Sequence, residues 1–202
     1  MSITTYAKLK SSIGDFLNRD DLTSVIPTFI SLAEARIARD LSHWKQEKRV
    51  TTDVDGRYEN LPTDWISIIQ VQYTDGGVIS SASSSEMAAY RAQSNTAAKP
   101  RYWRLTANEM EFYPIPDATY NITMLYKARI PALSDADPDN WLLTYAPDIM
   151  LYAALMQSAP YLADDARVSI WGSLYQSGVE ALNRESDQAR VSGPLSMRIP
   201  RQ

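Results

Sequence analysis

The chain has 202 residues, of which 45% are hydrophobic and 22% are charged, and its formal net charge is −4 at pH 7. This composition is that of a globular protein and excludes a wholly disordered chain. Cysteine is absent, which excludes disulfides and thiolate catalysis, and the single histidine, His43, excludes a histidine-rich metal site. No run of about 18 apolar residues is present, so we expect no membrane-spanning helix. We also expect no cofactor and no metal.

The first 45 residues predict two amphipathic helices. A helix over residues 6–17 can be capped by Thr4 or Thr5, and its buried face is expected to hold Tyr6, Leu9, Ile13, Phe16 and Leu17. A second helix should begin near Pro27, because proline suits the first helical turn. Its buried stripe is expected to hold Ile26, Ile30, Ala33, Ile37 and Leu41.

Residues 46–130 predict mostly strands. Asp55-Gly56 is a strong hairpin signal, and it lies between segments 47–54 and 57–61. Pro62-Thr63-Asp64-Trp65 predicts a turn. Strands are expected over residues 66–73 and 120–126, and residues 102–105 and 110–113 predict another hairpin around residues 106–109. Ser83 followed by Glu86 has the spacing of a capping box, which predicts a short helix over residues 86–92.

Helices return after Pro131. Residues 141–145 predict a short helical turn, and residues 148–158 are apolar nearly all round, which is typical of a helix at the centre of a bundle. A long helix is expected over residues 164–185, with a stripe of Ala166, Ile170, Leu174, Gly178 and Leu182. Gly178 in that stripe indicates either a tolerated glycine or a close helix–helix approach.

These elements predict a mainly α fold. The expected helical bundle is formed by residues 1–45 and 131–186, with a β-rich insertion at 46–130 and an extended C-terminal tail at 187–202. Gly193-Pro194 and Pro200 disfavour helix in the tail, where Leu195, Met197 and Ile199 alternate with polar residues. Residues 132–186 carry two basic and eight acidic groups, whereas the tail carries three basic groups and one acidic group. Such a tail can be frayed in the free chain and still dock on a partner.

Few residues offer catalytic chemistry. His43 follows the second predicted helix, where it is either a capping histidine or the base of a triad. The remaining option is a pair of carboxylates, as in a glycan hydrolase, for which the candidates are Asp53 with Asp55, Asp135 with Asp137, and Asp164 with Asp165. No glycine-rich phosphate loop is present. A soluble regulatory bundle is a third alternative, and the β-rich insertion and the tail speak against it.

Several stretches of the sequence match, taken together, the pattern of a known protein family. They are Phe16-Leu-Asn-Arg19-Asp-Asp-Leu22, the helix Ile26–Leu41, Leu61-Pro-Thr-Asp-Trp65, Pro100-Arg-Tyr-Trp103 and Tyr145-Ala-Pro-Asp148. Together they resemble the tailed-phage head-to-tail adaptor proteins, the connector subunits related to the gatekeeper or tail tubular protein A group of short-tailed phages. The resemblance touches most of the chain, and its motifs are structural ones without an active-site signature.

The resemblance implies a structural virion protein without enzymatic activity. It implies a ring of about twelve copies under the portal protein, which would extend the DNA channel and form a platform for nozzle and other tail proteins. DNA would pass through without specific binding, and no membrane would be involved. The protein would be found at the head–tail junction of the virion, and in the host cytoplasm during assembly. The C-terminal extension would reach the portal, and the docking residues there would be Arg190, Leu195, Met197, Arg198, Ile199 and Arg201.

Overall fold

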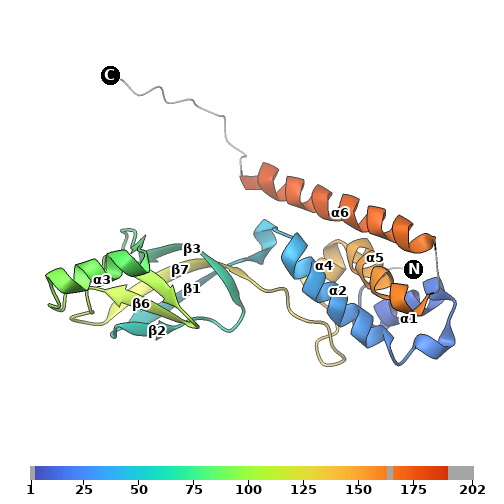
Figure 1. Cartoon of the computed structure of the whole chain (residues 1–202), viewed down its shortest axis with the longest axis horizontal. Coiled ribbons are helices and arrows are strands. Elements are labelled where there is room, and N and C mark those ends of the chain that lie inside the picture. The colour runs from blue at the N-terminus through green and yellow to red at the C-terminus, as the bar shows by residue number, and fades with distance from the viewer. Residues whose placement is uncertain (1–2, 163–165, 191–202) are drawn as a thin grey trace, which may run out of the picture. The chain divides into compact units, whose positions relative to one another are not determined.

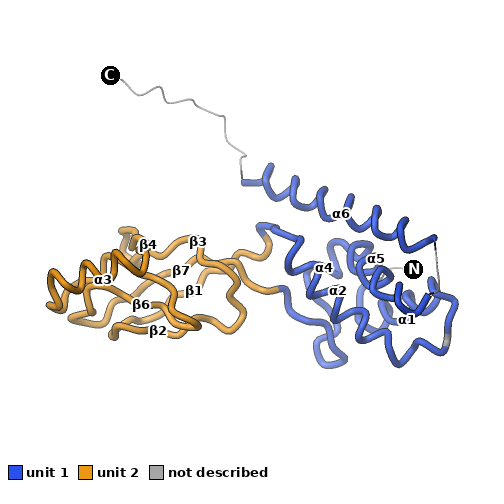
Figure 2. Tube along the Cα trace, in the orientation of Figure 1, with its two compact units in different colours: residues 1–44, 130–202 blue, residues 45–129 orange. Residues whose placement is uncertain are grey.

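The computed structural model of the protein describes residues 3–162 and 166–190 (Figure 1). The chain forms two compact units, a helical unit of residues 1–44 and 130–202 and a β unit of residues 45–129 (Figure 2). Helices take up 46% and strands 23% of the described residues. The expectation of a mainly α fold is therefore wrong, and the protein is mixed α/β. The expectation treated the middle segment as an insertion into a helical bundle, whereas this segment forms two sheets with a core of their own.

The helical unit is arranged around one apolar helix. Its elements are α1 (Tyr6–Leu17), α2 (Ile26–Asp40), α4 (Trp141–Tyr145), α5 (Pro147–Gln157) and α6 (Arg167–Arg190), with short 3-10 turns at Asp20–Leu22 and Ala159–Tyr161. Helix α5 contacts α1, α2, α4 and α6, and its buried residues are Ile149, Met150, Leu151, Ala153, Ala154 and Leu155. The predicted central position of this helix is confirmed, because apolar residues all round a helix are stable only where neighbours cover every side.

The first two helices form largely as their patterns predict. The side chain of Thr5 caps α1 by accepting a hydrogen bond from the backbone N–H of Lys8 at 3.3 Å. Pro27 lies in the first turn of α2, and the expected stripe of α2 is buried, with Phe29 added to it. Phe16 is an exception, since it is exposed although it was expected on the buried face of α1.

Helix α6 buries a different face from the expected one. Its buried residues are Trp171, Tyr175, Val179, Leu182 and Ser186, whereas Ile170 and Leu174 of the predicted stripe are exposed. The two large aromatic residues decide the face, since they remove more apolar area from water than Ile170 and Leu174 would. The helix also continues to Arg190, so residues 187–190 are not part of an extended tail as expected.

The β unit contains two sheets. Its strands are β1 (Glu47–Val54), β2 (Tyr58–Asn60), β3 (Trp65–Tyr73), β4 (Ser80–Ser81), β5 (Tyr102–Thr106), β6 (Glu109–Tyr113) and β7 (Tyr120–Ala128). One sheet has the order β1-β7-β3 and the other β2-β6-β5-β4. All paired strands are antiparallel except the short pair β4 and β5. A shared core from both sheets, which includes Val54, Val71, Phe112, Ile122 and Met124, holds them together.

The Asp55-Gly56 signal does not form a hairpin. Strand β1 pairs with β7, from Glu47 opposite Lys127 to Val54 opposite Tyr120, whereas β2 pairs with β6 in the other sheet. The chain thus changes sheets at Asp55-Gly56, because both flanking strands find longer partners far away in sequence. The predicted hairpin of β5 and β6 is confirmed, with Arg104 opposite Glu111.

Helix α3 (Ser84–Gln93) is fixed to the second sheet by a capping box and an ion pair network. Ser83 and Glu86 form both reciprocal bonds of the predicted capping box. The carboxylate of Glu111 is buried and accepts hydrogen bonds from Arg91 of α3 at 2.9 Å and from Arg104 of β5 at 2.5 Å. Because removal of one partner would leave a buried charge unpaired, this network ties α3 to β5 and β6.

Candidate functional site

The single histidine belongs to the core of the helical unit. His43 is buried, and its ring stacks on Trp141 at a centroid distance of 5.4 Å and lies 5.5 Å from the ring of Trp44. Helix α2 ends at Asp40 with Leu41 as its C-cap, so His43 lies two residues beyond the cap position. Its surroundings are aromatic and closed, which makes it a packing residue.

In two of the three candidate carboxylate pairs, one member is occupied in a structural contact. Asp53 accepts a hydrogen bond from the side-chain amide of Asn121 at 2.8 Å on the outer face of the first sheet. Asp135 pairs with Lys10 at 2.8 Å in the helical unit, and Asp164 with Asp165 lies outside the described residues. In the described part of the chain no group of three or more His, Asp or Glu side chains is placed to hold a metal ion. These contacts lend the glycan hydrolase alternative no support.

The C-terminal half of α6 holds the segment that leads out of α2. Asn183 accepts a hydrogen bond from the backbone N–H of Ser42 at 2.8 Å and donates one to the carbonyl of Asp40 at 3.1 Å. Three residues further along, Ser186 accepts the backbone N–H of Trp44 at 2.9 Å. The end of α6 is therefore attached to the residues that immediately precede the β unit.

The predicted docking residues divide between the end of α6 and the chain beyond it. Arg190 is the last residue of α6 and is exposed. The other five, namely Leu195, Met197, Arg198, Ile199 and Arg201, lie outside the described residues. The attached end of α6 thus leads directly into the predicted docking segment.

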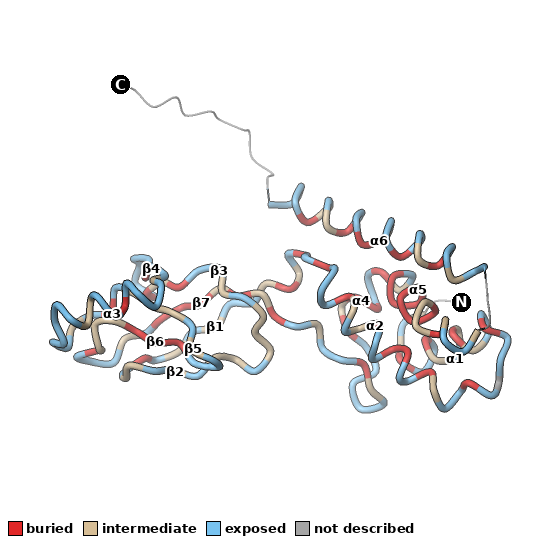
Figure 3. Tube along the Cα trace, in the orientation of Figure 1, coloured by how far each residue is buried: buried red, intermediate tan, exposed pale blue. Residues whose placement is uncertain are grey.

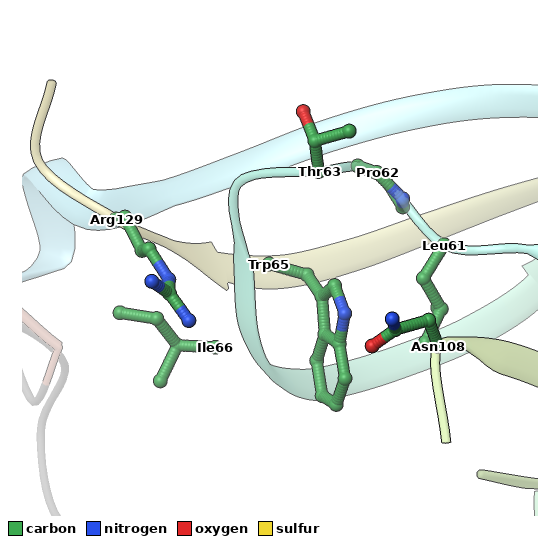
Figure 4. A pocket seen from close by; sticks show the side chains of 7 residues that line it. All are labelled: Leu61, Pro62, Thr63, Trp65, Ile66, Asn108 and Arg129. Atoms are coloured by element: carbon green, nitrogen blue, oxygen red, sulfur yellow. The ribbon is translucent and has the colours of Figure 1, made fainter. Parts of the chain in front are cut away.

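One pocket in the β unit is built on the Leu61–Trp65 motif. It has a volume of about 510 Å³ and is lined by Leu61, Pro62, Thr63, Trp65, Ile66, Asn108 and Arg129. Figure 4 shows Arg129 beside Ile66 at one end, with Leu61 and Asn108 at the other. A lining that combines apolar side chains with a hydroxyl, an amide and one guanidinium suits a protein segment, because it offers apolar contact together with polar and charged donors.

Asp64, which lies within the Leu61–Trp65 motif, joins this motif to β1 and β7 by hydrogen bonds. Its carboxylate accepts hydrogen bonds from Lys48 at 2.6 Å and from the Tyr126 hydroxyl at 2.9 Å, and its carbonyl accepts the backbone N–H of Arg129 at 2.7 Å. The hydrogen bond from Lys48 is the main reason that the pKa of Asp64 lies below its usual value. The sequence motif indicated a turn here, but the partners on β1 and β7 are too distant in sequence to be predicted.

A second group of side chains gathers around Lys99. Its ammonium lies 4.0 Å from the centre of the Tyr73 ring and 5.8 Å from that of Tyr120. The neighbouring turn after β3 contains Gly76 and Gly77, both with positive φ, and it exposes 65% of Val78. Burial, the largest cause, raises the pKa of Tyr73 to about 12, so the ring stays neutral. The carboxylate of Asp75 in the same turn lies 4.0 Å from the Lys99 ammonium, so these side chains make contacts with one another.

Exposed apolar side chains mark the helical unit as well. They include Phe16, Leu32, Ile170 and Leu174, and Figure 3 shows the exposed sides of α2 and α6 in pale blue. Ile170 and Leu174 lie four residues apart on α6, so their side chains are neighbours on one exposed side of that helix. None of the described helices is both long and apolar enough to cross a membrane.

Comparison with known families agrees with a binding role. A comparison of the sequence with curated proteins finds no match. Residues 4–198, nearly the whole chain, match the family described as SU10 adaptor protein. This family is consistent with the resemblance to phage head-to-tail adaptors. The match includes both units, the Leu61–Trp65 pocket and the predicted docking residues up to Arg198. The chain is thus a phage adaptor protein and belongs to the SU10 adaptor protein family.

Proposed function

We propose that this adaptor forms a ring of about twelve copies under the portal protein and extends the DNA channel toward the tail. The observation that carries the proposal is the family match over residues 4–198. The protein acts by binding and not by catalysis, and it is a structural part of the virion at the head–tail junction. Tail proteins attach to the ring on the side away from the portal.

The charge of the chain supports a passive DNA channel. A wall that paired with many phosphates would hold DNA in a strongly salt-dependent way. The chain is acidic overall, and its β unit is balanced, with ten basic and ten acidic residues between positions 45 and 129. DNA therefore passes without specific binding.

Electron microscopy of the purified chain mixed with the portal protein of the same phage tests this function. We expect a ring coaxial with the portal, and the number of subunits can be counted from its rotational symmetry. A chain that binds the portal as single scattered copies, or does not bind it, would contradict the proposed function.

The portal anchor is proposed to be the segment that follows α6. Leu195, Met197 and Ile199 would fill shallow apolar pockets, while Arg190, Arg198 and Arg201 would pair with acidic portal groups. An extended segment of this kind gains order only on binding. The attachment of α6 to Ser42 and Trp44 supports the proposal, because the anchor then begins at a fixed point of the helical unit.

Truncation separates the anchor from the fold. A chain that ends at Arg190 keeps all of α6, so we expect it to melt within about 1 °C of the full chain. Its affinity for the portal should fall at least tenfold, measured by biolayer interferometry. The matched control replaces Ile69 with serine in the full chain, which alters an exposed apolar residue in the β unit and should leave portal affinity unchanged. Unchanged affinity of the truncated chain would place the anchor elsewhere.

A further inference from the structure

Two helices of the helical unit expose faces with the same spacing. The exposed face of α6 carries Ile170, Leu174, Ser177 and Ala181, which we name the α6 seam. The exposed face of α2 carries Thr28, Leu32, Ala35 and Arg39, which we name the α2 seam. In both seams the residues follow each other at intervals of four, three and four. That is the spacing of the a and d positions through which two helices pack along their length.

Each seam carries at least one large apolar side chain and faces away from the buried side of its helix. Leu32 is 49% exposed, Leu174 44% and Ile170 57%. The remaining positions are mostly small, so that a second helix can approach closely. Within the copy, each helix already packs against α5 through its other face. The seams are therefore two separate surfaces left over after the core is complete.

The two helices run in the same direction within one copy. At their starts, the guanidinium of Arg167 donates to the carbonyl of Phe16 at the end of α1, and Ile26 of α2 lies against Gly14 of α1. At their ends, Asn183 of α6 donates to the carbonyl of Asp40. Figure 1 shows both helices running from right to left. Rotation about an axis along these helices keeps neighbouring copies parallel, so α6 of one copy would meet α2 of the next in parallel.

The charges agree with the register in which Leu174 packs beside Leu32. If Leu174 packs beside Leu32, the equal spacing brings Arg39 beside Ala181, next to the exposed carboxylate of Glu180. Arg39 makes no ion pair with a described residue of its own copy, and Glu180 accepts a side-chain hydrogen bond from Gln176. An acidic group on the α6 side and a basic group on the α2 side thus complement each other.

The same register keeps the two copies level. Asp40 accepts a hydrogen bond from Tyr175 and its carbonyl accepts one from Asn183, so the end of α2 lies beside this stretch of α6 within one copy. The register that pairs Leu174 with Leu32 places Asp40 opposite residue 182 of the neighbouring copy, which lies within the same 175–183 stretch of α6. A ring closes by rotation without a rise along its axis, and this register meets that condition to within about one helical turn.

We infer that the occupant of the α6 seam is the α2 seam of a second copy of this chain. The contact joins two different faces, which is what a ring requires of each subunit. The inference rests on the proposed ring and adds the surfaces that would form it. The chain segment after α6 and a different phage protein are the other possible occupants, and the experiment below tells them apart.

Disulfide trapping tests the contact, and the absence of cysteine from the sequence gives a clean background. The test chain carries Leu32→Cys together with Leu174→Cys, both at exposed positions, and is oxidised in complex with the portal protein. We expect a ladder of covalent species that extends beyond the dimer on a non-reducing gel. Each single variant should give no species larger than a dimer.

The control pair is Leu32→Cys with Gln188→Cys. Gln188 is exposed on the same side of α6 but lies 14 residues beyond Leu174, about 21 Å along the helix, so we expect no ladder. If rings are seen by electron microscopy and the test pair gives no more ladder than this control, the seam contact is wrong and the ring stands. A ladder that stops at the dimer would keep the contact and overturn the ring. Absence of rings would overturn both.

A charge exchange gives a second measurement. Arg39→Glu should lower the fraction of portal complexes that carry complete rings at least fivefold, and the double variant Arg39→Glu with Glu180→Arg should restore it. Arg101→Glu, an exposed change in the β unit, is the matched control and should leave ring formation unchanged. Loss of rings with no recovery in the double variant would show that Arg39 and Glu180 do not meet.

Discussion

Gly178 of α6 lies directly against Ile149 of α5. A Cβ atom at position 178 would come within 2.9 Å of Ile149 Cγ1, and Ile149 is buried in the centre of the helical unit. The close helix–helix approach that the sequence suggested at Gly178 is therefore confirmed. It allows α6 to bring Trp171 and Tyr175 into the core on the same face.

This contact predicts opposite effects for two glycines of one helix. Gly178→Ala should lower the free energy of unfolding by about 1 kcal/mol, because the strain of overpacking outweighs the gain in helix propensity. Gly172→Ala should raise it by up to about 1 kcal/mol, since its Cβ would lie 3.6 Å from Met156 Cε, an ordinary contact. Urea denaturation followed by circular dichroism measures both. A stabilising alanine at position 178 would show that α5 and α6 can move apart freely.

Glu34 predicts a pH dependence of the helical unit. Its burial raises the pKa of the carboxyl, while a hydrogen bond from the backbone N–H of Leu133 at 2.7 Å acts in the opposite direction. A raised folded-state pKa means that the contribution to stability is complete below about pH 4.5 and is lost as the pH rises through the folded-state pKa. Glu34→Gln keeps an acceptor for Leu133 and removes the charge.

We therefore expect Glu34→Gln to be more stable than the natural chain at pH 7, by less than about 1 kcal/mol, with the difference disappearing below pH 4.5. Thermal denaturation across this range measures it. Glu34→Ala serves as the control, because it also removes the acceptor; it should be destabilising by about 1–2 kcal/mol below pH 4.5 and by less at pH 7, where it also removes the buried charge. A glutamine variant that is less stable at pH 7 than at pH 4, relative to the natural chain, would contradict this.

Asp64 predicts the reverse behaviour in the β unit. Its pKa is lowered, chiefly by the hydrogen bond from Lys48, so its contribution is present above about pH 4 and is lost as the pH falls through the folded-state value. Asp64→Asn should destabilise the β unit by about 1–2 kcal/mol at pH 7 and by little near pH 2. Hydrogen exchange of the β7 amides at the two pH values reports this difference. Asp55→Asn, at an exposed turn, should show no such dependence.

Asn183 predicts a local effect. Its side chain satisfies one backbone N–H and one carbonyl in the segment after α2, so Asn183→Ala should destabilise that segment by about 1–2 kcal/mol. We expect amide exchange of Ser42 and Trp44 to become at least fivefold faster, with α1 unchanged. Asn95→Ala, at an exposed position of the β unit, is the control. Equal acceleration in α1 would mean that the helical unit opens as a whole.

The sequence predicted those features of the fold that depend on neighbouring residues. Thr5, Pro27 and the Ser83–Glu86 capping box mark helix starts through contacts within one turn. The hairpin of β5 and β6 likewise needs only a short turn. The partners of the strands were harder to predict from the sequence. Strand β1 pairs with β7 across more than 60 residues, and this long-range pairing outweighs the local hairpin signal at Asp55-Gly56.

The face of α6 shows a different limit. Two apolar stripes one residue apart both fit a helical period, and only the tertiary contact with α5 decides between Trp171 with Tyr175 and Ile170 with Leu174. The exposed stripe was taken for core, and it is now the part of α6 to which we assign a contact with a second copy. The docking role of residues 191–202 stays a prediction.

The β unit enters and leaves the chain through neighbouring strands. Glu47 near its first residue lies opposite Lys127 near its last, so the two ends of the unit are adjacent in space. A short flexible linker could then bridge positions 45 and 129 and delete the whole unit while α2 and α4 keep their connection. The β unit can therefore be removed from the chain without breaking the connection between α2 and α4. A chain shortened in this way would keep α2 and α6, the two helices to which we assign the contact between copies.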